Sequence, residues 1–71
     1  MKYININKAT NGNYYIVETK KDNDGLGTIF FYKDWKKWVF EPEEHTIYDS
    51  VCMIEIAEFM KKFSIKGEDY D

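Results

Sequence analysis

The stretch from Thr28 to Phe40 constrains the fold of this chain more than any other part of the sequence. Aromatic and β-branched residues stand on both sides of a short polar turn centred near Asp34. This arrangement is typical of a β-hairpin, because such side chains suit a pleated, half-buried surface. No other stretch has so much apolar side chain to bury, so the rest of the chain must be arranged to cover it.

Three segments precede this hairpin. Residues 2–7 alternate isoleucine with asparagine, which predicts a short strand with one buried face. The Asn-Gly pair at positions 11 and 12 favours a tight turn, because both residue types tolerate positive φ. Residues 14–20 are therefore expected to form a second, antiparallel strand. Residues 21–27 are rich in Asp, Asn and Gly, and they are predicted to be a polar loop.

The last part of the chain has helical periodicity. Pro42 is expected to end the final strand, and Asp49 and Ser50 are candidate N-caps for a helix from Val51 to Phe63. One helix face carries an apolar stripe of Cys52, Ile56, Phe59, Met60 and Phe63. The other face is predicted to carry the charged residues Glu55, Glu58, Lys61 and Lys62.

These elements predict an α+β fold in which one C-terminal helix packs on one face of a four-stranded antiparallel meander, in the order ββββα. The 71 residues suffice for a single domain, expected over residues 1–66. Gly67 is a candidate helix breaker, and residues 67–71 are expected to form a loose acidic tail. A single helix covers one sheet face only, although aromatic residues are predicted on both faces. The surplus must therefore meet something other than the helix.

Composition indicates the cellular compartment in which the protein is expected. Cys52 is the only cysteine, which fits a reducing compartment and excludes an internal disulfide. We see neither a signal-peptide pattern nor an apolar run long enough to cross a bilayer, so a cytoplasmic protein without membrane contact is expected. Residues 1–40 carry seven lysines and four acids, whereas residues 41–71 carry three lysines and nine acids.

The sequence offers no catalytic, cofactor or metal site that we would assign. His45 is the only histidine, and its acidic neighbours are better explained as a solvated loop than as a metal cluster. A calcium loop that began at Asp22 would place Lys33 where the bidentate acid belongs. Cys52 lies on the apolar helix stripe, where a thiol packs as a small hydrophobe. The chain is therefore expected not to be an enzyme.

Two binding functions remain. Aromatic residues and lysines alternate around the hairpin turn, which is the composition of a platform for single-stranded nucleic acid. The absence of arginine, an acidic isoelectric point near 5.1 and the acidic second half argue against this alternative. Protein binding is favoured, because an uncovered aromatic sheet face is typical of an interface, including that of a homodimer. The candidate partner-binding residues are Tyr15, Tyr32, Trp35, Lys36 and Lys37.

The segment from Gly27 to Lys62 carries two short motifs. The strand motif W-x-x-[YW]-V-F-x-P and the helix motif C-[LM]-x-E-I-x-x-F are matched by Trp35, Trp38, Val39, Phe40, Pro42, Cys52, Met53, Glu55, Ile56 and Phe59. With these motifs the chain resembles a loose group of small bacteriophage and prophage proteins. The resemblance implies an accessory protein in the host cytoplasm that binds a host or phage protein and modulates or inhibits it, for example a defence or nucleic-acid enzyme. Lys36 stands where the group has an arginine.

Overall fold

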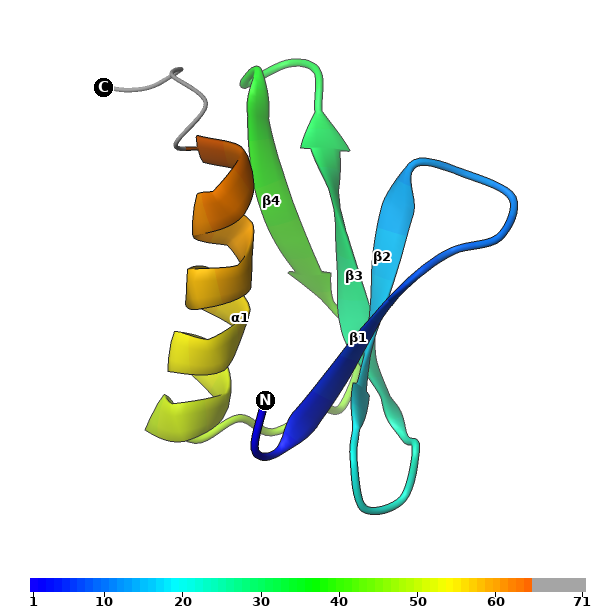
Figure 1. The fold of residues 1–71 in the computed structure, drawn as a ribbon, viewed down its shortest axis with the longest axis vertical. Coiled ribbons are helices and arrows are strands. Elements are labelled where there is room, and N and C mark those ends of the chain that lie inside the picture. The colour runs from blue at the N-terminus through cyan, green and yellow to red at the C-terminus, as the bar shows by residue number, and fades with distance from the viewer. Residues whose placement is uncertain (65–71) are drawn as a thin grey trace.

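The computed structural model describes residues 1–64 and shows four strands followed by one helix (Figure 1). The elements are β1 (Ile4–Lys8), β2 (Tyr14–Thr19), β3 (Gly25–Tyr32), β4 (Lys37–Pro42) and α1 (Ser50–Ser64). The strands form one antiparallel sheet in the order β1-β2-β3-β4, and α1 packs against one of its faces. The predicted α+β class and ββββα order are confirmed. The predicted breaker Gly67, the domain limit at residue 66 and the tail at 67–71 lie outside the described residues.

β3 is longer than the sequence indicated. It begins at Gly25, whereas residues 21–27 were predicted to be a loop and the strand was expected from Thr28. Leu26 is only 6% exposed and belongs to the core. The pairing of β2 with β3 shifts register between Val17 and Glu18, which leaves Leu26 as the extra residue of a bulge. The sequence did not predict this part of the strand, because Gly25 and Gly27 on either side of Leu26 have no side chain to contribute to an apolar alternation.

The core lies between α1 and the sheet face that it covers. Five hydrophobic side chains form its buried centre: Ile4, Val17, Leu26, Ile29 and Ile56. Aromatic rings extend the core toward the end of α1, where Trp38 stacks on Phe63 at 4.3 Å between ring centroids. The predicted helix stripe is therefore confirmed as the side of α1 that faces the sheet.

The structure also shows which residues of the hairpin face the helix. Trp38 and Phe40 pack against the core under α1, whereas Val39 lies between them and points to the opposite face. Trp35 lies in the turn between β3 and β4, next to Asp34, and is not part of either strand. Lys36 takes a positive φ of 55° there, and its amide donates to the carbonyl oxygen of Lys33 at 3.2 Å.

The start of α1 follows the prediction. The carboxylate of Asp49 accepts a hydrogen bond from the backbone amide of Cys52 at 2.9 Å, which is the geometry of an N-cap. This hydrogen bond holds the pKa of Asp49 below its ordinary value. One of the first backbone amides of α1, which have no partner within the helix, is thereby satisfied.

Glu55 makes a contact that the sequence did not predict. It lies off the apolar stripe, as expected, with its side chain half-exposed, and its carboxylate accepts hydrogen bonds from the backbone amides of Lys2 at 2.9 Å and Tyr3 at 3.3 Å. Partial burial by itself raises the pKa of Glu55. The two amide hydrogen bonds and the positive N-terminus outweigh that effect, so the pKa lies below its ordinary value. Glu55 thus fastens the chain start to α1.

This contact predicts a pH-dependent contribution to stability. Because the folded-state pKa of Glu55 is lowered, its contribution is present above the ordinary carboxyl pKa and is lost as the pH falls through the folded value. We expect Glu55→Gln to lower the melting temperature at pH 7, and the difference from wild type to shrink as the pH falls to about 3. Thermal unfolding followed by circular dichroism at several pH values measures this.

Glu58→Gln is the matched control, since Glu58 lies exposed on the same helix. Its difference from wild type should stay small across the same pH range. A pH-independent loss of melting temperature in Glu55→Gln would show that the ionised carboxylate is not what holds the chain start.

Candidate interaction surface on the open sheet face

The sheet face opposite α1 has no second layer over it in the described part of the chain (Figure 1). We call this the open face. Strand register aligns Tyr14, Phe30 and Val39 in one row across β2, β3 and β4. Ile16 and Tyr32 lie beside this row on the same face, because alternate residues of a strand point to the same side. An apolar strip therefore crosses the sheet on the side away from the helix.

The aromatic end of this strip lies next to the turn between β3 and β4. The rings of Tyr32 and Trp35 meet edge to face with centroids 5.1 Å apart, and those of Phe30 and Tyr32 do so at 6.4 Å. The side chain of Trp35 is nevertheless 65% exposed. These rings border a hollow of about 420 Å³, whose other lining residues are Val39, Phe40, Glu41 and Pro42.

Lysines border the same end of the open face. Lys33 and Lys36 are exposed in the turn, and Lys37 is exposed at the start of β4, where it pairs with Tyr32. Asp34 is the one acid within the turn. The aromatic end of the open face is therefore positively charged at its edge, although the chain as a whole has a net charge of −3.

Four of the five predicted binding residues come together and the fifth does not. Tyr32, Trp35, Lys36 and Lys37 lie at the aromatic end of the open face or in the adjoining turn. Tyr15 lies on the helix side, where its ring contacts that of Phe59 with centroids 5.1 Å apart. Tyr15 alternates with its neighbour Tyr14, so only one of the two can reach the open face.

The predicted set left out two residues that the structure adds to the site. Phe30 and Val39 form the floor of the apolar strip next to Tyr32. Their signal was present in the sequence as strand alternation, since Phe30 shares a face with Tyr32 and Val39 shares one with Lys37. What the sequence could not supply was the face that α1 takes.

Cys52 and the acidic side chains are the residues of this chain that could serve in catalysis or metal binding. The thiol of Cys52 is partly buried, and this desolvation together with its hydrogen bond to Asp49 raises its pKa, which disfavours the reactive thiolate. Within residues 1–64, no three histidine, cysteine, aspartate or glutamate side chains gather as a metal site would require. The one helix of the described region is too short and too polar to span a membrane.

Comparisons with known protein families, with curated protein sequences and with solved structures found no match to this chain. Its function is therefore inferred from the residues of the open face.

Proposed function

We propose that this chain is a non-enzymatic binding protein that docks onto another protein through the aromatic end of its open face. The observation that carries the proposal is Trp35, a large ring left 65% exposed beside an apolar hollow. Tryptophan and tyrosine are the side chains most enriched among the residues that dominate interface energies. The resemblance to phage accessory proteins supports a host protein as the partner, and modulation of that protein as the outcome.

Charge indicates the chemistry of the partner surface. Lys33, Lys36 and Lys37 border the aromatic end, and across an interface positive groups are matched by negative ones. The partner surface is accordingly an apolar patch that accepts the Trp35 ring and is bordered by acidic side chains. Rim charges of this kind act mainly on the association rate, so binding should slow as salt is raised.

Affinity capture from a host lysate tests this proposal. Tagged wild-type chain should recover a partner that Trp35→Ala does not recover. Ile47→Ala is the matched control, because Ile47 is an apolar residue 91% exposed in the connection between β4 and α1, and this variant should behave as wild type. Capture that is equal for all three chains, or absent for all of them, would contradict the proposal.

Single-stranded nucleic acid is the second candidate, favoured by the contact between Tyr32 and Trp35 next to three lysines. Titration of the chain with oligonucleotides at low and high salt separates the two functions. The exposed Trp35 would lose fluorescence on stacking with a base. Quenching that weakens steeply with salt would support this candidate. Unchanged fluorescence at low salt would remove it.

A further inference from the structure

The outer edge of β4 has no partner strand in residues 1–64. β4 ends the strand order and pairs only with β3. The amide of Glu43 donates to the carbonyl oxygen of Leu26 at 2.8 Å, which fixes the phase of hydrogen bonding along this pair. Because hydrogen-bonding residues alternate in an antiparallel ladder, Lys37, Val39 and Glu41 direct their backbone groups toward β3.

Trp38 and Phe40 consequently direct their backbone N–H and C=O groups outward, along the free edge. An exposed edge of this kind is a template for another strand. Natural edge strands are usually protected by charges, and β4 has one charge near each end, Lys37 and Glu41. The two charges are opposite in sign, so the best-matched added strand carries an acid opposite Lys37 and a base opposite Glu41.

We propose that β4 pairs with β4 of a second copy of the chain, antiparallel and centred on Val39. In this register Lys37 lies opposite the partner's Glu41, and Trp38 lies opposite the partner's Phe40. The register agrees with the hydrogen-bond phase, because Trp38 and Phe40 are the residues whose backbone groups are free. Every cross-strand pair is then favourable: opposite charges at both ends, aromatic pairs inside them and two valines at the centre.

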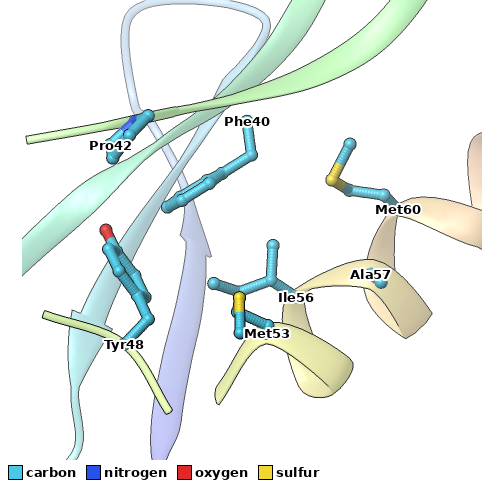
Figure 2. Close-up of a pocket in the computed structure, with 7 residues that line it drawn as sticks. All are labelled: Phe40, Pro42, Tyr48, Met53, Ile56, Ala57 and Met60. Carbon is cyan, nitrogen blue, oxygen red and sulfur yellow. The ribbon is translucent and has the colours of Figure 1, made fainter. Parts of the chain in front are cut away.

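Apolar side chains also surround this edge above and below the sheet. On the helix side, Figure 2 shows a groove between β4 and α1, with a volume of about 350 Å³. Its lining residues are Phe40, Pro42, Tyr48, Met53, Ile56, Ala57 and Met60. Met53 is 55% exposed at this groove. Phe40 and Pro42 also border the hollow on the open face, so a strand added beside β4 would contact apolar surface on both sides of the sheet.

The other edge of the sheet does not offer the same match. β1 runs Ile-Asn-Ile-Asn-Lys and contains one charge, so two copies could not form reciprocal ion pairs along it.

The proposed pairing also fixes the arrangement of the two helices. Two antiparallel β4 strands are related by a two-fold axis perpendicular to the sheet, so both copies of α1 would lie on the same side of an eight-stranded sheet. Both open faces would lie together on the other side. The register spans residues 37–41, so the dimer takes up Lys37 and the β4 side of the hollow but leaves the rings of Tyr32 and Trp35 uncovered. Trp35→Ala therefore tests the partner surface and Glu41→Lys tests the dimer, and the two proposals can fail separately.

Analytical ultracentrifugation over a wide concentration range tests the dimer by charge exchange. We expect wild-type chain to dimerise, and Lys37→Glu or Glu41→Lys alone to raise the dissociation constant about tenfold or more, because like charges then face each other. The double variant Lys37→Glu/Glu41→Lys should return the constant close to the wild-type value. Glu44→Lys makes the same charge change outside β4 and should have little effect.

Circular dichroism of each variant shows whether it is folded, and only folded variants are compared. A wild-type chain that stays monomeric at every concentration would overturn the proposal. A dimer insensitive to both single charge reversals, or a double variant that does not recover, would overturn it equally. Loss of the dimer in Trp35→Ala with no loss in Glu41→Lys would place the contact between open faces and not at β4.

Discussion

Replacing Gly27 with alanine is expected to lower the free energy of unfolding by about 3 kcal/mol, one of the largest effects of any single substitution in this chain. A Cβ at this position would lie 2.3 Å from the carbonyl oxygen of Glu41 and 2.8 Å from the ring of Phe40. The first contact is with backbone in the neighbouring strand, so it cannot be relieved by a side-chain rotation. Either β4 moves away from β3 or Gly27 leaves the sheet.

Gly25→Ala provides the control within the same strand, because a Cβ there meets no atom within 4 Å. Thermal unfolding should place the melting temperature of Gly27→Ala about 15 °C below wild type, and that of Gly25→Ala within a few degrees of it. Similar melting temperatures for the two variants would mean that β3 and β4 are not as close at this point as the structure places them.

Truncating Trp35 to alanine is expected to weaken binding to the captured partner about thirtyfold or more. That factor corresponds to the 2 kcal/mol or more that defines a dominant interface residue. The loss should appear mainly as faster dissociation, since most interface substitutions act on that rate. Because Trp35 is 65% exposed and lies in a turn, the same substitution should change the stability of the free chain by only about 0.5 kcal/mol.

Lys33→Ala and Lys36→Ala, two turn lysines outside the proposed dimer contact, separate the charge contribution from the aromatic one. Both lysines are exposed, so their removal should slow association at low salt and have less effect at high salt. An affinity unchanged by Trp35→Ala but strongly reduced by the lysine substitutions would indicate an electrostatic contact in place of the aromatic docking proposed here. Isothermal titration or surface-immobilised kinetics with purified partner measures both quantities.

The fold was largely readable from the sequence because its signals are local. Alternating residues, an Asn-Gly turn and a helical stripe after Asp49 each depend on near neighbours, and the strands and the helix stand where these signals placed them. The failures concern contacts between distant segments. Leu26 joined the core because a bulge in β3, opposite Val17 and Glu18, and the approach of β4 extended β3 into an apparent loop. Glu55 met the backbone of Lys2 and Tyr3, more than fifty residues away in the chain.

The candidate site was readable in part for the same reason. Tyr32, Trp35 and the lysines are neighbours in sequence, so their gathering at one turn followed from the hairpin alone. The face that α1 covers depends on the connection from Pro42 to Asp49 and on the packing of Phe40 with Tyr48, whose rings meet edge to face at 5.7 Å. No local pattern encodes that choice. Because α1 covers this face, Tyr15 is packed under the helix and Phe30 lies on the open face.

Site-specific photocrosslinking tests most directly whether the open face is where a partner protein binds. A benzoylphenylalanine in place of Tyr32, an aromatic residue of the open face that is 36% exposed, should form a covalent adduct with the captured partner in lysate. The same group in place of Ile47, which is more exposed but lies in the connection between β4 and α1, should not form one. Adducts from position 47 without adducts from position 32 would contradict the account.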